Sequence, residues 1–452
     1  MNPLAHVAVP TSELPGVVWP AMPSIEGARM LATQFQFAQS ERWTPQQLSR
    51  AQFAQLGLLL RHARDTVPFY RERFGDVNLG QLDATSFAWI PLITRSDIQA
   101  HFEAMTSRAV PRDHGRVYAG QSSGSTGSPL RFRFTDLQEV FWHAYTLRDH
   151  LWHRRDLSGR LGAIRGRVTP GAVAGWGEST DSAYQTGAAV MCNTHSSMEE
   201  QADWLLREDP DYLIGIASNL QALARHCAGR GLRPRRLREV RTYGEALHPD
   251  ARAEVRRAWN VPLVDMYTCR EGGYLALQCP QHEHYHVQAE GVYLELLNEA
   301  GRACAPGEIG RVVITPLHNF AMPMIRYAIG DMAEAGAPCD CGRGLPVIRR
   351  IMGRTRNMLH RPGGGVRYPR FGELLFGDIA PVLQYQVVQK TLRDIEVALV
   401  TSRPLTADEE RRLRELIVGQ LGDPFAIVFV YRDSIPRTAE GKYEEFRSEV
   451  QP

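Results

Sequence analysis

The spacing of apolar and polar residues changes along the chain. After a proline-rich arm over about residues 1–25, helical spacing dominates to about residue 80. A Thr-Arg-Ser-Asp cluster at 94–97 then stands before an apolar-periodic stretch and predicts a helix start. Between about residues 115 and 350, short apolar segments such as 211–216 alternate with glycine-rich turns and helical stretches. This alternation predicts an α/β body.

The pattern differs in the last hundred residues. Apolar residues alternate with polar ones over 395–399, as in a strand, and 425–431 reads as a second strand. Thr406 and Glu409 form a capping box ahead of an apolar helix face. We therefore predict a large domain over 1–352, followed by a small α+β domain over 353–452.

Composition narrows the class of protein. The chain has 452 residues, of which 43% are hydrophobic and 23% charged, as in an ordinary globular protein. The formal charge is 52 − 50 = +2, so no strong field favours nucleic acid or an acidic membrane as a partner. No apolar run approaches ~18 residues, and the first 25 residues lack the pattern of a secretory signal. We expect a cytoplasmic protein with no membrane span.

Lysine is rare. Lys390 and Lys442 are the only two among 52 basic residues. A GC-rich genome explains most of this bias, and under it a remaining lysine is expected where a compact point charge is hard to replace.

A glycine- and hydroxyl-rich loop is the strongest chemical feature. It covers residues 121–129 with the sequence QSSGSTGSP. Such a loop exposes backbone N–H groups and hydroxyls, which suit the phosphates of a nucleotide. Taken alone, it is also compatible with a flexible surface loop, and it is not the common GxxxxGK[ST] phosphate loop.

Five further segments follow this loop in order. They are 241–247 (RTYGEAL), 265–271 (DMYTCRE), 325–331 (IRYAIGD), 353–357 (GRTRN) and 435–442 (IPRTAEGK). Together with the loop, this set resembles the adenylate-forming superfamily of acyl-CoA synthetases. Three other segments resemble its phenylacetate–CoA ligase and CapK branch in particular: 90–98, 339–346 and 384–389.

The resemblance implies a large multi-sheet adenylation domain and a small mobile C-terminal lid, with roles for particular residues. The ATP phosphates would bind to the loop, at Ser122, Ser123, Gly124, Ser125, Thr126 and Gly127. The adenine and ribose would contact a second group, formed by Gly244, Glu245, Ala246, Tyr267, Asp331 and Arg354.

Three residues are expected at the reacting phosphate. The resemblance implies that Glu271 binds Mg²⁺, which prefers oxygen ligands, and that Lys442 bridges the acyl carboxylate and the α-phosphate. Arg270 stands where relatives usually have Thr, and it can supply cationic charge or pair with a nearby carboxylate. Ser128 and Thr268 also depart from the family pattern, where Lys and Gly are usual. Arg356 falls at the position of the hinge of the lid.

Seven cysteines without a signal sequence argue against a disulfide framework. Cys339 and Cys341, with Cys279 and one histidine, form a Cys₃His zinc set over about 279–341. His286 best matches the position in the resembling branch, and His282 and His284 are the alternatives. The zinc would be structural. Reduced free cysteines beside a His-rich turn are the competing interpretation.

The activity implied is ATP-dependent activation of a carboxylic acid, aryl or arylacetic in this branch, as an acyl-adenylate. Coenzyme A is the leading acceptor. An amine, a hydroxyl or a carrier-protein thiol is the alternative, and a non-catalytic nucleotide-binding scaffold is the least favoured. The sequence does not identify the acid or the acceptor, and it does not determine whether the protein forms a homodimer. Six residues fall in segments that could line the acyl pocket: Trp176, Tyr184, His195, Ile216, Ala217 and Tyr243.

Overall fold

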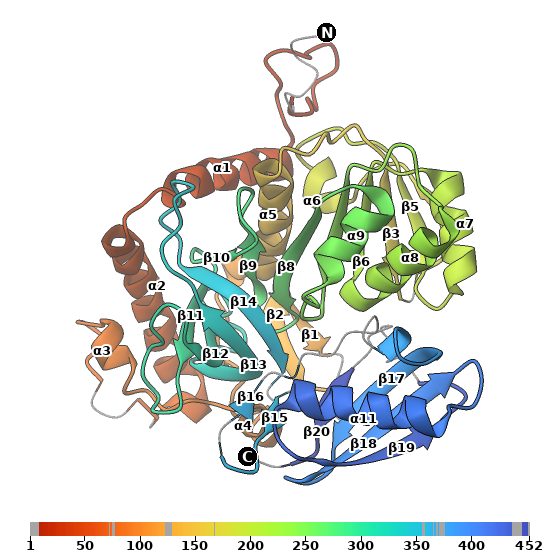
Figure 1. Cartoon of the computed structure of the whole chain (residues 1–452). Coiled ribbons are helices and arrows are strands. Elements are labelled where there is room, and N and C mark those ends of the chain that lie inside the picture. Colours follow the sequence, from red (N-terminus) through yellow and green to blue (C-terminus); the bar gives the residue numbers. More distant parts are fainter. Residues whose placement is uncertain are drawn as a thin grey trace. The chain divides into compact units, whose positions relative to one another are not determined.

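The chain folds into two compact units, which we describe separately. A computed structural model describes residues 9–450 except 72, 75–76, 123–128, 167, 355–357, 365, 368, 370–375 and 436–444. The large unit comprises Met1–Leu247 and Ala251–Ile351, and the small unit comprises His248–Asp250 and Met352–Pro452 (Figure 1). The predicted α/β fold class is confirmed.

A mixed sheet, with 12 strands among the described residues, forms the core of the large unit. Its order is β11-β12-β13-β14-β10-β9-β8-β7-β6-β3-β5-β4, and β1 and β2 form a separate antiparallel ribbon. The strands are β1 (Val117–Gln121), β2 (Arg131–Thr135), β3 (Leu161–Arg165), β4 (Gly171–Val173), β5 (Ala189–Asn193), β6 (Tyr212–Ile216), β7 (Glu239–Tyr243), β8 (Leu263–Cys269), β9 (Gly273–Gln278), β10 (Tyr285–Val287), β11 (Val292–Leu297), β12 (Ile309–Pro316), β13 (Tyr327–Ala335) and β14 (Val347–Arg354).

Helices surround this sheet. Thr94 caps the predicted helix start, because its side chain accepts a hydrogen bond from the Asp97 backbone N–H and the Asp97 side chain reciprocates. The helices are α1 (Ile25–Ser40), α2 (Pro45–Thr66), α3 (Ala84–Phe87), α4 (Arg95–Ala100), α5 (Asp136–Trp152), α6 (Glu178–Asp181), α7 (Met198–Glu208), α8 (Ala217–Arg230) and α9 (Ala251–Trp259), with the 3₁₀ turns η1 (Pro68–Tyr70) and η2 (Arg112–His114).

The parallel strands β5, β3, β6, β7 and β8 set the position of the candidate site. β6 is buried along its whole length, as expected of a strand covered on both faces. The connections through α7, α8 and α9 all move across the sheet in one direction, so right-handed crossovers place these helices on one face. The connection from β3 to β5 moves the other way and places α6 on the opposite face, where it packs against α5 (Figure 1).

In its described part, the small unit contains a four-stranded sheet, the helix α11 and a two-stranded ribbon of β15 and β16. Its sheet order is β19-β18-β17-β20, with β18 antiparallel to β17 and parallel to β19. The expected capping box at Thr406 and Glu409 is present, and Leu413, Ile417 and Leu421 of the helix are buried. The elements are β15 (Leu359–His360), β16 (Val366–Arg367), β17 (Val382–Gln389), β18 (Asp394–Thr401), α11 (Ala407–Leu421), β19 (Ala426–Tyr431) and β20 (Phe446–Ser448).

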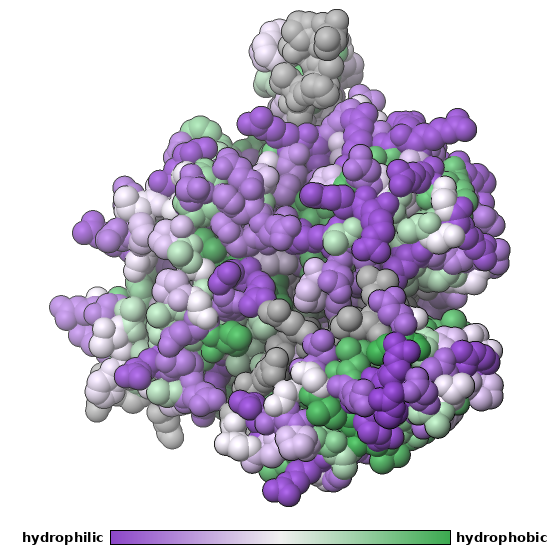
Figure 2. All heavy atoms as spheres, in the orientation of Figure 1, coloured by the Kyte–Doolittle hydropathy of each residue, from purple (hydrophilic) through white to green (hydrophobic). Residues whose placement is uncertain are grey.

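The N-terminal arm runs ahead of α1 and is anchored to the large unit. The Thr11 backbone N–H donates to the Ala183 carbonyl at 2.9 Å, and Pro10 forms a β-bridge with Tyr184. Hydrophilic residues cover most of the visible face of the large unit (Figure 2). None of the described helices is long and apolar enough to cross a membrane.

Candidate active site

Tyr267 and Asp331, from two of the sequence motifs, meet in the large unit. The Tyr267 hydroxyl donates to Asp331 Oδ2 at 2.6 Å, and both residues are 7% exposed. Their strands, β8 and β13, lie four positions apart in the sheet order, which would separate them by about 19 Å in a flat sheet at ~4.8 Å per strand. The sheet therefore curls and places the carboxyl end of β8 against β13.

Gly244 and Glu245 follow β7 directly. Gly244 has φ +81°, a conformation that glycine adopts without strain. The turn directs Glu245 toward the start of α8, where Glu245 Oε2 accepts a hydrogen bond from the Ser218 backbone N–H at 2.9 Å. A carboxylate at a helix N-terminus is stabilised by the exposed N–H groups and the helix dipole. Glu245 thus fixes the loop that contains Gly244 and the half-buried Ala246.

Arg270 and Glu271 occupy the turn between β8 and β9. Glu271 is 6% exposed, whereas Arg270 is exposed to solvent. The Gly272 backbone N–H donates to Cys269 Sγ at 3.2 Å, which tightens the turn. The Glu271 carboxylate is therefore buried in the protein, whereas the Arg270 guanidinium lies in solvent.

Ser122 and Leu130, on either side of residues 123–128, are hydrogen-bonded to each other. The Ser122 backbone N–H donates to the Leu130 carbonyl at 2.8 Å, and the Ser122 Oγ accepts from the Leu130 N–H at 3.0 Å. Arg354 is half-buried at the end of β14. Seven other predicted residues lie outside the described part of the chain: Ser123, Gly124, Ser125, Thr126, Gly127, Arg356 and Lys442.

The predicted metal ligands come together at β10 and the 339–341 turn. Cys279 Sγ lies 3.9 Å from Cys339 Sγ, and Cys341 Sγ lies 3.3 Å from His286 Nε2. The ligand atoms of Cys279, His284, His286 and Cys339 all lie within 4.8 Å of one another. We call Cys279, His286, Cys339 and Cys341 the Cys/His cluster.

The three candidate histidines have different surroundings. His286 is fully buried on β10, and burial, with the nearby His284 and Arg343, lowers its pKa to about 3. His282 Nε2 instead contacts Asp340 Oδ1 at 2.6 Å, on a more exposed part of the turn. The His284 Nε2 atom is buried without a hydrogen-bond partner in the described part of the chain. His286 and His284 therefore face the cysteines, and His282 pairs with a carboxylate.

Two of the expected acyl-pocket residues have other contacts. Trp176 Nε1 donates to the Gly159 carbonyl at 2.9 Å, and Tyr184 is buried where the N-terminal arm is anchored. Ile216, Ala217 and Tyr243 do lie at the carboxyl ends of adjacent parallel strands, and His195 is exposed just after β5. The ends of parallel strands are where α/β sheets bind ligands.

Sequence reasoning missed the role of Asp265. This buried residue on β8 accepts hydrogen bonds from Thr242 Oγ1 and the Tyr285 hydroxyl, both at 2.6 Å. Burial raises the pKa of the Asp265 carboxyl to about 6, against the opposing effect of these hydrogen bonds. It ties β7 and β8 to β10. An acidic residue inside the apolar segment 263–267 was the available signal.

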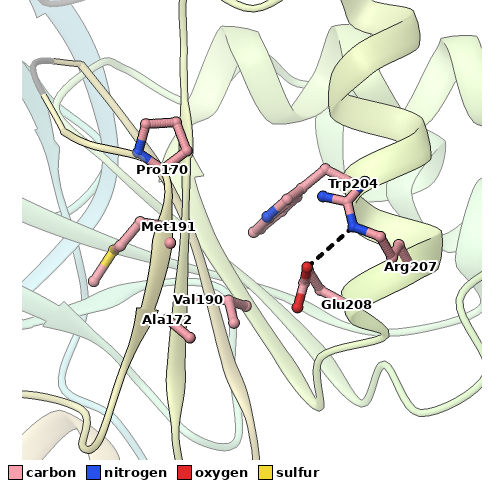
Figure 3. Close-up of a pocket in the computed structure, with 8 residues that line it drawn as sticks. Pro170, Ala172, Val190, Met191, Trp204, Arg207 and Glu208 are labelled. Carbon is pink, nitrogen blue, oxygen red and sulfur yellow. Dashed lines mark hydrogen bonds and ion pairs between the residues drawn. The ribbon is translucent and has the colours of Figure 1, made fainter.

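A cavity of about 300 Å³ lies elsewhere in the large unit, between α7 and the strands β4 and β5 (Figure 3). Trp204 lines it beside the ion pair of Arg207 Nε and Glu208 Oε1, at 3.2 Å. None of the residues assigned to ATP, magnesium or zinc lines this cavity.

Comparisons with known proteins show which proteins this chain is similar to. Residues 373–448 match the CapK C-terminal domain family. The chain is 27% identical to the phenylacetate-coenzyme A ligase of Escherichia coli (strain K12) over 88% of this chain and 93% of that protein. It is 28% identical to the Thermus thermophilus protein of the same name, over 79% of this chain and 82% of the relative. A crystal structure of 2-hydroxyisobutyryl-CoA ligase, in the postadenylation state, superposes with a TM-score of 0.70 and 18% identity, covering 91% of this chain and 92% of that one.

These matches confirm the resemblance that the motifs predicted. The fold is that of the adenylate-forming acid–CoA ligases. Within that superfamily, the similar sequences and the matched C-terminal domain are those of the phenylacetate–CoA ligase and CapK branch.

Proposed function

We propose that this protein is an adenylate-forming acid–CoA ligase. It activates a carboxylic acid with ATP, releases pyrophosphate, and transfers the acyl group to coenzyme A with release of AMP. The hydrogen bond between Tyr267 and Asp331 is the observation that carries this proposal. It brings two motifs, 64 residues apart, together beside the carboxyl end of β8, where the resemblance puts the nucleoside.

The residues have distinct roles in this proposal. Tyr267 stacks on the adenine, while Asp331, oriented by the Tyr267 hydroxyl, accepts hydrogen bonds from the ribose. Gly244, Glu245, Ala246 and Arg354 complete the nucleoside site, and Ser122–Gly127 hold the phosphates. The buried carboxylate of Glu271 suits Mg²⁺, which would offset charge on the phosphates when bound.

Two half-reactions follow. In the first, a carboxylate oxygen of the acid attacks the α-phosphorus, the bond from phosphorus to the bridging oxygen of the β-phosphate breaks, and pyrophosphate leaves. Lys442 and Arg270 stabilise the negative charge that builds on the α-phosphate. In the second, the thiolate of coenzyme A attacks the acyl carbon, and AMP leaves as the bond from carbon to oxygen breaks.

The relatives favour an aryl or arylacetic acid, because the Escherichia coli and Thermus thermophilus proteins are named for phenylacetate. An amine, a hydroxyl or a carrier-protein thiol as acceptor is the second candidate, since it uses the same adenylate. A non-catalytic scaffold is disfavoured because Glu271, Asp331 and Lys442 are all retained.

Pyrophosphate release over a panel of aryl, arylacetic and aliphatic acids tests the proposal. We expect acid-dependent release that requires ATP and Mg²⁺, and AMP formation that coenzyme A accelerates more than candidate amines do. The proposal is wrong if no acid causes pyrophosphate release and calorimetry detects no ATP binding.

Lys442→Ala separates the half-reactions. Loss of a charge-stabilising donor is expected to slow adenylation by ~10²–10³-fold. Transfer from a preformed acyl-adenylate should be largely spared. Lys442→Arg should not restore adenylation, since a planar guanidinium does not replace a point charge. Equal loss in both half-reactions would remove this role from Lys442.

We also propose that the Cys/His cluster holds one structural zinc ion. Tetrahedral zinc places two sulfur ligands roughly 3.8 Å apart, and sulfur and nitrogen ligands roughly 3.6 Å apart. The distances of 3.9 Å between Cys279 and Cys339 and 3.3 Å between Cys341 and His286 fit this geometry. The lowered pKa of His286 keeps its imidazole neutral at pH 7, which is the form that binds metal.

Metal analysis of protein purified without a histidine tag should find about one zinc per chain. The double variant Cys339→Ser, Cys341→Ser should lose it. His286→Asn should also lose the metal, while His284→Asn, the matched control, should retain it. Full zinc in the double variant would refute the assignment, and the opposite result for the two histidines would transfer the ligand role to His284.

A further inference from the structure

Arg165 lies where the order of the parallel strands in the large unit reverses. β3 pairs with β5 on one side and β6 on the other, and the chain reverses its direction across the sheet at β3. Ligands bind at such switch points, beyond the carboxyl ends of the strands. Arg165 is the last residue of β3.

Arg165, Ile216 and Tyr243 form a row across three adjacent strands. Ile164 pairs with Gly215 in the β3–β6 register, which puts Arg165 beside Ile216, and Ile216 pairs directly with Tyr243. Laterally adjacent residues of parallel strands point to the same face. The Arg165 Cζ atom lies 5.9 Å from the centre of the Tyr243 ring, so the guanidinium reaches over the buried Ile216.

This face is the one that α5 covers. Arg241, two residues before Tyr243 on β7, pairs with Asp149 of α5. One and two turns earlier on α5, Thr146 contacts the Tyr274 hydroxyl at 2.9 Å and Trp142 lies 4.8 Å from the Tyr274 ring. The row beginning at Arg165 therefore borders a surface rich in aromatic side chains.

The guanidinium of Arg165 has no ion-pair partner within the described part of the chain. Among the described residues, no carboxylate pairs with its guanidinium, and its recorded contact is with the Tyr243 ring. Arg241 on the same face is buried and paired with Asp149, so it has no free charge to offer. Arg165 is exposed and accessible to a ligand.

We propose that Arg165 selects acids that carry a second carboxylate. The substrate class is then an aromatic dicarboxylic acid, whose ring lies against the aromatic surface and whose distal carboxylate pairs with the Arg165 guanidinium. A guanidinium is a planar fork that matches a carboxylate with two parallel hydrogen bonds. The inference rests on the proposed function, because it assigns the substrate of that same site.

Matched pairs of acids test this selection. Pyrophosphate release is measured with phenylacetate against 4-carboxyphenylacetate and 3-carboxyphenylacetate, and with benzoate against terephthalate. We expect kcat/KM to be roughly 10–100-fold higher for terephthalate than for benzoate, and for the better carboxyphenylacetate than for phenylacetate, the factor expected for hydrogen bonds to a charged group. Arg165→Gln should remove this preference and leave the monocarboxylates and the KM for ATP unchanged.

Two further variants control the result. Arg165→Lys keeps the charge without the fork, and should retain part of the preference. Arg207→Gln, an exposed arginine of α7 that lines the separate cavity, should change nothing (Figure 3). A wild-type preference for monocarboxylates would overturn the inference while leaving the proposed function intact. An equal loss for all acids in Arg165→Gln would assign Arg165 to a phosphate or to coenzyme A instead. No pyrophosphate release with any acid would remove the proposed function and this inference together.

Discussion

Two polar clusters of the large unit differ in how their charges are balanced. In the first, which we call the salt cluster, Asp149, Arg155, Glu239 and Arg241 place unlike charges together. Arg155 Nη1 lies 2.8 Å from Asp149 Oδ2, and Arg155 Nε lies 2.7 Å from Glu239 Oε1. Arg241 pairs with the same Asp149 carboxylate. In the Cys/His cluster, by contrast, three thiols and one imidazole face one another, and the Arg343 guanidinium donates to Cys341 Sγ at 3.6 Å.

The pKa directions express this difference. Burial raises the pKa of Asp149, but Arg155 and Arg241 hold it well below its ordinary value. Burial raises the pKa of Cys339 to about 12, and the neighbouring thiols Cys279 and Cys341 add to the rise. The salt cluster thus balances two carboxylates with two guanidinium groups, whereas the raised pKa values of Cys279 and Cys339 keep these two thiols protonated unless a metal ion binds them. The comparison teaches that opposite charges held together stabilise the fold by themselves, whereas thiols and an imidazole held at the spacing of zinc ligands point to a metal ion.

The largest effect is expected from breaking the salt cluster. Asp149→Ala leaves two guanidinium groups buried without their shared partner, which should lower the free energy of unfolding by about 3–5 kcal/mol. Urea unfolding measures the loss. Glu415→Ala, which removes half of the exposed Arg411–Glu415 pair, is the control and should leave the free energy of unfolding nearly unchanged. A loss below ~1 kcal/mol for Asp149→Ala would mean that the cluster is not the stabilising unit that its geometry indicates.

Metal removal should come next. A strong chelator should lower the free energy of unfolding of the wild type by about 3 kcal/mol, the gain expected from a metal at ~100 times its Kd. The Cys339→Ser, Cys341→Ser variant should start near the chelated value and show no response. Thermal unfolding with and without chelator gives the measurement. If the chelator does not change the free energy of unfolding of the wild type, the Cys/His cluster is not stabilised by a bound metal.

Asp265 sharpens the comparison, because it is a buried carboxyl with neutral donors from Thr242 and Tyr285. Its raised pKa of about 6 means that the folded state holds a proton that the unfolded state, with an ordinary pKa near 3.8, releases between about pH 4 and 6. This contribution to stability is therefore full below pH 4 and is lost as the pH rises through 6.

From pH 4 to 7, the wild type should lose about 2–3 kcal/mol of unfolding free energy relative to Asp265→Asn, which cannot titrate. Urea unfolding of both proteins across this range checks the difference. Asp149, with its lowered pKa, acts in the opposite direction and only below about pH 4. Parallel pH profiles for the two proteins would contradict the raised pKa of Asp265.

The smallest effect is expected at the nucleoside site. Tyr267→Phe removes the hydroxyl that donates to Asp331, which should weaken ATP binding by about 1–2 kcal/mol because Asp331 loses its orientation. Isothermal titration calorimetry measures the change. Tyr212→Phe is the matched control, since its hydroxyl bonds the Asp156 backbone N–H at 2.8 Å away from the motifs. Equal affinities for the two variants would argue that the Tyr267–Asp331 bond does not serve the nucleotide.

The sequence by itself determined the features that depend on neighbouring residues. The capping boxes at Thr94 and Thr406 involve residues three positions apart, so their hydrogen bonds follow from local spacing. The alternation over 395–399 likewise predicts β18. The ordered motifs indicated the adenylate-forming class because each motif is a short segment whose residues act together.

Tertiary structure alone decided what distant residues do to one another. The sequence left His282, His284 and His286 open, since all three lie within five residues; the β10 pairing buries His286 and leaves His282 beside Asp340. The sequence did not distinguish Arg165 as a candidate site residue, because arginine supplies 50 of the 52 basic residues. It differs from the others through strand order, and because no described carboxylate forms an ion pair with it. Charge pairing and burial depend on distances through space, which only the folded chain fixes.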